Sequence, residues 1–387
     1  MQEPPRAGPP QVDHPTARPG RVVGVDLTRG VAIAGMMAAH IVTSSDTGFP
    51  LRLYELSEGR ASATFAVLAG LSLGLANSRG GDARSRAAAR VGILVRGLVI
   101  GFVGLFLVGL GTNIAVILPY YGLAFLAVLP VLWWPARRLL PLAGTWLLLA
   151  PVASLALRRG LPPGPGDQPT PASLAQPVEL LQTLLLTGYY PVIGWTGYLL
   201  LGLAVSRLDL RAARTGVRLL AGGAALAAAA WLASALLLGP LGGRAILGDL
   251  TGAVFYGTVP ATSWWWLAVR SPHSGTPPDL LHTSGCALAV LGLALLLPHL
   301  ATRLLAPLAA FGGMPLTVYT AHVVAIALYP ASGTDRPGLL LLAHVLVGCL
   351  LAALWRRTAG RGPLESVVRT ISSGASATVE GPARAPA

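Results

Sequence analysis

The chain has 387 residues, of which 53% are hydrophobic and only 11% are charged, whereas a soluble domain has roughly 25% charged residues. Its net charge of +13 comes from arginine alone, because the sequence contains no lysine. This composition excludes an ordinary soluble domain and predicts an all-α polytopic integral membrane protein whose main partner is the lipid bilayer. Arginines that flank apolar spans serve topology, so the basic charge indicates no nucleic acid as a partner.

Residues 1–20 are rich in Pro and Gly and lack the apolar core of a signal peptide, which predicts a disordered cytoplasmic leader. Apolar runs follow, each of the roughly 17 to 25 residues needed to cross ~30 Å of hydrocarbon, and they predict about ten transmembrane helices (roughly 10–12). The predicted spans lie near 23–44, 61–77, 92–111, 113–134, 138–157, 188–206, 216–239, 281–299, 304–331 and 338–355. Residues 21–357 would form the transmembrane domain. Residues 358–387 are expected to be a cytoplasmic tail, mostly disordered beyond about residue 372.

Arginine placement gives an orientation independently of hydropathy. Most arginines fall in segments that lie inside if the N-terminus is cytoplasmic, which predicts both termini in the cytoplasm and an even number of crossings. The Ala, Gly, Pro and Arg bias is typical of a GC-rich genome and points to a multi-pass protein of a bacterial plasma membrane. Cys286 and Cys349 lie in apolar runs, so a disulfide framework is not expected.

Ionisable residues concentrate in the first span, VVGVDLTRGVAIAGMMAAHIV. Asp26 and Arg29 are three residues apart, so they can pair on one helix face. Arg29 and His40 are eleven apart, which places them about 20° out of line and roughly 16 Å apart along the axis. Such groups within a span are costly and usually functional. Two other readings stay open, an Arg29 that only snorkels to the interface and a His40 that only bonds a neighbouring helix.

A second polar cluster lies in the ninth predicted span, at FGGMPLTVYTAHVVAI. Gly312 and Gly313 followed by Pro315 break the apolar run and restart a helix, whose N-terminus carries partial positive charge. His322 lies seven residues along, with Tyr319 one turn before it. This pair is a candidate second half of a site that faces the first span. A kinked packing helix with a satisfied histidine is the open alternative.

Several segments resemble, in their order along the chain, bacterial members of the heparan-alpha-glucosaminide N-acetyltransferase-like family. The first segment, RVVGVDLTRGVAIAGMMAAHIV, is similar to the family's opening of an Arg, a short gap, an Asp, two residues, an Arg-Gly pair and an apolar helix. The later ones are GYYPVIGWTGYLLLGLAVSR, SGCALAVLGLALLL, AAFGGMPLTVYTAHVVAI and RGPLESVVR. Together they spread over most of residues 21–369.

The resemblance implies a transmembrane acyltransferase. Acetyl-CoA or another acyl-CoA, bound from the cytoplasm, would give its acyl group to an amine or hydroxyl of a sugar or envelope glycan on the outer side. Asp26 and Arg29 match the family's Asp and Arg-Gly. His40 matches a position that is Asn in the animal lysosomal enzymes, whose active histidine comes in the following loop. This sequence has no histidine between His40 and His273, so either His40 has taken the role or the activity has changed.

Each residue type has a chemical reason for its expected role. Phosphates of a CoA need cations at the inner face, and a histidine can act as general base or as acyl acceptor. We therefore expect three cofactor-binding and three catalytic residues: Asp26, Arg29 and Arg96, and His40, His322 and Tyr319. The partners expected beside the bilayer are the acyl-CoA and a glycan or small-molecule acceptor, and no metal is expected.

A transporter or flippase of a small polar or lipid-linked molecule is the alternative from another class, because discontinuous helices often form midplane substrate sites. A catalytically dead structural or regulatory partner is a third reading. Small-residue faces at 97–104 and 221–223 allow close helix packing within one chain or between chains, so a homo-oligomer is left open.

Overall fold

The computed structural model describes residues 21–43, 46–78, 80–161, 168–250, 253–330 and 334–380, and the predicted leader lies outside them. These residues form helices and contain no β-strand. The α-helices are α1 (Val23–Ile41), α2 (Gly48–Ser57), α3 (Arg60–Ala76), α4 (Ala83–Val108), α5 (Leu118–Ala127), α6 (Ala136–Arg158), α7 (Pro177–Gln182), α8 (Val192–Val205), α9 (Ala213–Leu238), α10 (Gly243–Leu247), α11 (Pro277–Leu296), α12 (His299–Leu304), α13 (Ala306–Gly312), α14 (Pro315–Leu328), α15 (Pro337–Thr358) and α16 (Pro363–Glu380).

Five of these helices are long and apolar enough to cross a bilayer, namely α4, α6, α9, α11 and α15. Three bent pairs raise the number to at most eight if each pair is one span: α2 with α3 (42°), Pro177–Thr187 with α8 (58°) and α13 with α14 (84°). The described residues therefore form a polytopic helical protein with five to eight candidate spans. The predicted count of about ten is not confirmed, and the orientation of the termini stays a prediction.

Two predicted spans differ from the observed helices for physical reasons. Helix α1 is not among the candidates because three ionisable side chains lower the mean hydropathy of its 19 residues. The predicted span 113–134 contains only the ten residues of α5, and a short 3-10 turn at Leu129–Val131 follows it. Pro130 lies in this turn, and proline has no N–H with which to continue an α-helix.

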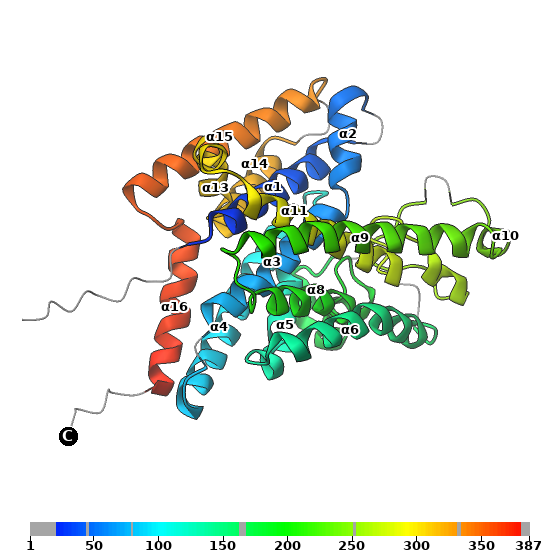
Figure 1. The fold of residues 1–387 in the computed structure, drawn as a ribbon, viewed down its shortest axis with the longest axis horizontal. Helices are drawn as coiled ribbons and strands as arrows, with labels where there is room; N and C mark the ends of the chain where they lie inside the picture. The colour runs from blue at the N-terminus through cyan, green and yellow to red at the C-terminus, as the bar shows by residue number, and fades with distance from the viewer. Residues whose placement is uncertain are drawn as a thin grey trace, which may run out of the picture.

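Helix α1 is central in the fold. It packs against α3, α11, α13 and α15, while α3 packs on α8 and α8 on α6. Figure 1 shows α16 running beside α4, although α4 belongs to the first third of the chain. Helices α13 and α14 meet at the predicted Gly-Gly break, and the 84° bend between them confirms this break.

Glycines allow α9 and α11 to pack closely. A Cβ on Gly223 would lie 2.6 Å from the carbonyl oxygen of Gly285, and a Cβ on Gly285 would lie 2.5 Å from that of Gly223. On α4, a Cβ on Gly104 would lie 2.5 Å from the backbone nitrogen of Pro119 in α5. These glycines of the two small-residue faces are therefore used for packing within one chain.

The described part of the tail is helical, in contrast to the disorder expected beyond about residue 372. Helix α16 packs against α4, where the Ser376 hydroxyl donates to the carbonyl oxygen of Ala88 (3.0 Å). Gly92 makes room for this hydroxyl. The Ser- and Ala-rich composition of the segment suggested disorder, but Ala has the highest helix propensity and small side chains permit a close approach.

Candidate cofactor cavity and histidine cluster

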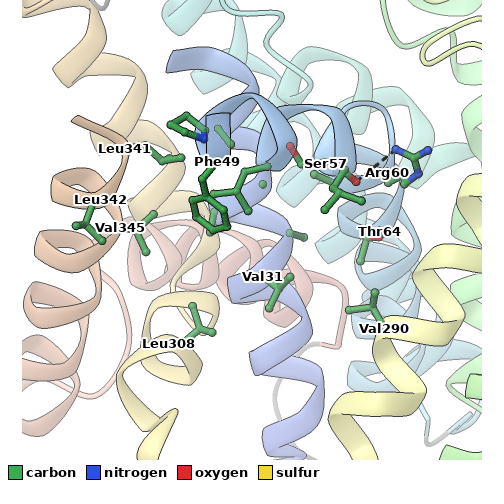
Figure 2. Close-up of a pocket in the computed structure, with 18 of the residues that line it drawn as sticks. Val31, Phe49, Ser57, Arg60, Thr64, Val290, Leu308, Leu341, Leu342 and Val345 are labelled. Carbon is green, nitrogen blue, oxygen red and sulfur yellow. Dashed lines mark hydrogen bonds between the residues drawn. The ribbon is translucent and has the colours of Figure 1, made fainter. Parts of the chain in front are cut away.

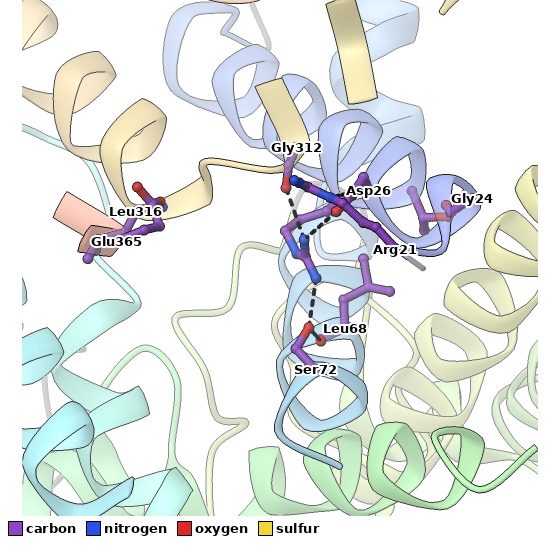
Figure 3. A network of polar contacts seen from close by, with 10 residues as sticks. Arg21, Gly24, Asp26, Leu68, Ser72, Gly312, Leu316 and Glu365 are labelled. Atoms are coloured by element: carbon purple, nitrogen blue, oxygen red, sulfur yellow. Dashed lines mark hydrogen bonds and ion pairs between the residues drawn. The ribbon is translucent and has the colours of Figure 1, made fainter. Parts of the chain in front are cut away.

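Arg29 joins three helices near the N-terminal end of α1, and its partners Asp26, Ser72 and Gly312 are labelled in Figure 3. Its Nη1 donates to Asp26 Oδ1 (3.1 Å) and to the carbonyl oxygen of Gly312 (3.0 Å), and its Nη2 donates to Ser72 Oγ (2.7 Å). Asp26 also pairs with Arg21. The pairing predicted from the three-residue spacing is present, and the side chain of Arg29 is only 13% exposed. Much of its donor capacity is therefore used to hold the fold together.

Two glycines, Gly30 of α1 and Gly312 of α13, explain how this network forms. A Cβ on Gly312 would lie 2.0 Å from the carbonyl oxygen of Asp26 and 2.3 Å from the nitrogen of Gly30, so α1 and α13 cross backbone to backbone. Helix α13 ends at Gly312, whose carbonyl is one of the four that lack an intrahelical donor. Arg29 supplies the missing donor. The Arg-Gly pair of the first helix and the Gly-Gly break are thus parts of one junction.

A cavity of about 820 Å³ lies beside this junction, between α1, α3, α4, α5, α14 and α16. Five arginines and two carboxylates line it: Arg21, Arg29, Arg96, Arg361, Arg369, Asp26 and Glu365. Asp26 already pairs with Arg21 and Arg29. The other three arginines have no carboxylate within 4 Å among the described residues. A concave surface with an excess of unpaired cations attracts anions.

Helix α16 supplies part of this cavity, which the sequence analysis did not foresee. The Glu365 carboxylate accepts hydrogen bonds from the backbone nitrogens of Leu316 (2.7 Å) and Thr317 (3.1 Å) at the start of α14. It also accepts one from the Thr317 hydroxyl. Glu365 and Arg369 are four residues apart in α16 and so fall on one helix face, and Arg361 lies just before the start of that helix. This spacing, within RGPLESVVR, was the available signal.

Two histidines meet at the other end of α1. His40 Nδ1 lies 3.2 Å from His322 Nε2, with the rings stacked at a centroid distance of 5.3 Å. The ring of His344 meets that of His322 edge-on at 5.2 Å, and Tyr319 lies 6.3 Å from the ring of His40. The expectation that the ninth predicted span faces the first is confirmed by these distances. The catalytic roles of the residues are not tested by them.

Two buried tyrosine hydroxyls lie between the cavity and the histidines. Tyr121 lines the cavity, and Tyr319 lies close enough to interact with it electrostatically. Neither hydroxyl has a hydrogen-bond partner among the described residues. A buried polar group left without a partner costs about 1–3 kcal/mol. The two side chains are the polar groups found here between the arginine-lined cavity and His40, and no hydrogen bond joins them in the described residues.

The profile of one protein family, described as heparan-alpha-glucosaminide N-acetyltransferase, catalytic, matches residues 21–238. The match covers more than half of the chain and includes Arg29, His40 and Arg96. The chain belongs to this family. Membership indicates membrane acetyltransferase activity. A comparison with curated protein sequences found no match.

The family match ends with α9, so two parts of the site lie beyond it. These are α14, which carries His322, and α16, which carries Glu365. Among the described residues, no group of three His, Cys, Asp or Glu side chains is arranged to hold a metal ion.

His273 is a further histidine of this family member that the sequence analysis did not assign to the site. It lies in the loop before α11, where its ring contacts Tyr189 (4.9 Å) and Tyr190 (5.9 Å). It also lies close enough to His40 to interact with it electrostatically. Its φ of 56° is uncommon for a residue other than Gly. Burial lowers the pKa of His273 to about 4, so its ring is neutral at pH 7.

An apolar pocket of about 690 Å³ lies on another side of α1, bordered by α2, α3, α11, α13 and α15 (Figure 2). Arg60 is the one charged residue among the described residues that line it. Its Nη1 donates to the carbonyl oxygens of Glu55 (2.8 Å) and Leu56 (3.4 Å) at the end of α2. These bonds give Arg60 a capping role at the C-terminal end of α2.

Proposed function

We propose that the chain is a membrane acyltransferase that binds acyl-CoA in the arginine-lined cavity and passes its acyl group to an amine or hydroxyl acceptor. The cavity carries the proposal, because its unpaired arginines suit the phosphates of CoA. With both termini in the cytoplasm, the cavity faces the cytoplasm. The histidine pair then lies toward the outer side, where a sugar or envelope glycan would be the acceptor.

The arginines of the cavity would have two different roles, phosphate binding and support of the cavity wall. Arg96, Arg361 and Arg369 have no carboxylate within 4 Å among the described residues and would hold the phosphates. Arg29 is largely committed to the junction of α1 and α13, so it would shape the cavity more than bind the ligand. From Arg29 to His40 the helix rises roughly 16 Å. The extended pantetheine arm of CoA would cover this distance past Tyr121.

The transfer step needs a base and a donor to the thioester oxygen. The base, an imidazole of the His40 and His322 pair, removes the proton of the acceptor N–H or O–H. The freed lone pair of the acceptor attacks the thioester carbonyl carbon. Tyr319, whose hydroxyl has no partner among the described residues, would donate to the carbonyl oxygen as negative charge develops there. The C–S bond then breaks, and the CoA thiolate takes the proton from the imidazolium. The products are the acylated acceptor and free CoA.

The hydrogen bond between the two histidines decides which nitrogen is the base. When His322 Nε2–H donates to His40 Nδ1, the lone pair on His322 Nδ1 is free to accept a proton. When His40 Nδ1–H donates instead, the free lone pair is on His40 Nε2. Either tautomer leaves one basic nitrogen on the pair.

The test is equilibrium binding of acetyl-CoA to the detergent-purified protein. Arg96→Gln and Arg369→Gln should each weaken binding about tenfold or more, since charge-assisted hydrogen bonds contribute about 1.5–3 kcal/mol. The matched control is Arg218→Gln on α9, an exposed arginine outside the cavity. Absence of binding by well-folded wild type would overturn the proposal. An equal effect of the control would show that the cavity is not the site.

A transporter or flippase is the second candidate, and the 84° break between α13 and α14 is the observation that favours it. This function predicts movement of a polar or lipid-linked solute across vesicles without consumption of acyl-CoA. Acyl transfer predicts release of free CoA that depends on the acceptor.

A further inference from the structure

A second hollow, of about 460 Å³, lies on the opposite side of the α14 N-terminus from the arginine-lined cavity. We call it the lateral groove; it is formed by α14 and α15, with Met37 of α1, Pro363 of α16 and Met314. Its wall is apolar except for four side chains, Thr317, His322, His344 and Trp355. The two hollows adjoin, since Thr317 lines the groove and its neighbour in the chain, Leu316, lines the cavity.

The lateral groove lies on a surface suited to lipid. Helix α15 is one of the five candidate spans, and only 17% of its most apolar window is buried in the protein. Leu346, Val347 and Leu350 on this helix are all more than half exposed. A contiguous set of exposed apolar side chains on a helix long enough to span a bilayer is suited to contact with hydrocarbon. The groove is therefore reached from the bilayer.

An unpartnered nitrogen marks the inner wall of the groove. His322 is only 3% exposed and lines the groove, and its Nδ1 has no hydrogen-bond partner among the described residues. Its Nε2 is 3.2 Å from His40 Nδ1. A buried polar atom without a partner calls for an explanation, and a bound ligand group is one.

We propose that the lateral groove binds the apolar chain of a lipid-linked acyl acceptor, whose hydroxyl or amine meets His322 Nδ1. A free sugar would exchange its many hydrogen bonds with water for the few polar groups of this wall, at about 1–3 kcal/mol for each group left unpaired. An apolar chain gains about 0.8 kcal/mol for each CH₂ removed from water. The groove thus selects an acceptor whose polar group is carried on an apolar body.

This inference rests on the proposed acyl transfer and adds the class of acceptor and its direction of approach. The donor would come from the arginine-lined cavity and the acceptor from the bilayer, on two sides of the histidine pair. His322 Nδ1 takes the proton from the acceptor hydroxyl or amine, whose lone pair attacks the thioester. The acylated lipid then leaves by the groove.

The groove is tested with a photoreactive dodecanol that carries a diazirine in its chain, applied to the full chain in phosphatidylcholine nanodiscs. We expect saturable labelling of α14 and α15, competed by dodecanol and not by butanol. Val347→Trp should reduce the saturable labelling about tenfold, because the indole fills the groove. Leu346→Trp is the matched control, since Leu346 is 52% and Val347 53% exposed but only Val347 lines the groove.

The hydroxyl contact is tested with a second probe and a second variant. His322→Ala should weaken labelling by the alcohol severalfold and leave labelling by a diazirine-bearing dodecane unchanged. Labelling spread evenly over all lipid-facing helices, or equal labelling of the two Trp variants, overturns the proposal.

Acetyl-CoA binding, measured on the same samples, separates this proposal from the proposed function. Binding of acetyl-CoA without groove labelling would refute the lipid-linked acceptor alone. Groove labelling without acetyl-CoA binding would refute the acyl-CoA donor and keep the groove as a lipid site.

Discussion

His40 and His322 share a hydrogen bond of 3.2 Å although 282 positions separate them in the chain. The contact depends on the bend between α13 and α14, which turns α14 toward the end of α1. We expect His40→Ala and His322→Ala each to lower kcat about 10²- to 10⁴-fold, the range for loss of a general base. Acetyl-CoA binding should remain within about threefold of wild type, since neither histidine lines the arginine-lined cavity.

The exposed His299 of α12 is the control for this prediction, because His299→Ala removes an imidazole that is not among the contacts of His40 and His322 in the described residues. Steady-state release of CoA and equilibrium binding are measured on the same preparations. Full activity of both pair variants would mean that the histidines only pack α1 against α14.

Arg29→Gln should lower stability more than it lowers cofactor affinity. The variant leaves Asp26 with Arg21 alone and takes the charged donor away from the carbonyl of Gly312. Because Asp26 keeps Arg21, the cost should lie below the roughly 3–5 kcal/mol that follows when a buried charge loses its only partner. A fall in apparent melting temperature of several degrees is expected, measured in detergent beside Arg96→Gln, which should melt close to wild type. If Arg29→Gln melts normally and only acetyl-CoA binding fails, its role is binding and not the junction.

Neighbouring glycines on α9 offer a test of the packing against α11. A Cβ on Gly223 would lie 2.6 Å from the backbone of Ala289 and Gly285, whereas a Cβ on Gly222 meets nothing within 4 Å. Gly223→Ala should therefore destabilise the protein by about 1–3 kcal/mol through overpacking. Gly222→Ala should be neutral or stabilise by up to about 1 kcal/mol through helix propensity. Melting curves that fail to separate the two variants would contradict the close contact.

Acid should destabilise the protein through His273. Burial lowers the pKa of His273 from its ordinary 6.5 to about 4 in the folded state. Between these pH values the unfolded chain binds more protons at His273 than the folded chain does. The contribution of the neutral His273 to the free energy of unfolding is therefore complete above about pH 6.5 and is lost as the pH falls toward 4. At pH 5.5 the loss is about 1 kcal/mol.

His273→Asn is the variant for this test, because Asn tolerates the positive φ of this position. Its melting temperature should fall less between pH 7.5 and pH 5.5 than that of wild type. An identical fall in both proteins would assign the acid sensitivity to other groups.

Local sequence patterns predicted the parts of the site that lie within one helix. The three-residue spacing gave the pair of Asp26 and Arg29, and the Gly-Gly-Met-Pro run gave the break before α14. The contact between His40 and His322 could be predicted on the assumption that polar faces of two membrane helices pack against each other. The cofactor and catalytic roles of these residues remain predictions.

The parts that were missed depend on contacts between distant segments. No local pattern tells that Gly312 accepts from Arg29, because that bond exists only once two glycines allow α1 and α13 to touch. Hydropathy likewise predicted a span at 113–134, where a proline-containing turn follows the short α5. The composition of α16 resembles that of a disordered tail, and its helix is stabilised by α4, nearly 300 positions earlier.

The contact of α16 with α4 has a consequence for biosynthesis. More than 250 residues separate the end of α4 from the start of α16. Ribosomes add about 5–20 residues per second, so α16 is synthesised roughly tens of seconds after α4. During that time the arginine-lined cavity lacks Arg361 and Arg369. A chain cut short by a late frameshift would keep every candidate span and still lack one wall of the arginine-lined cavity.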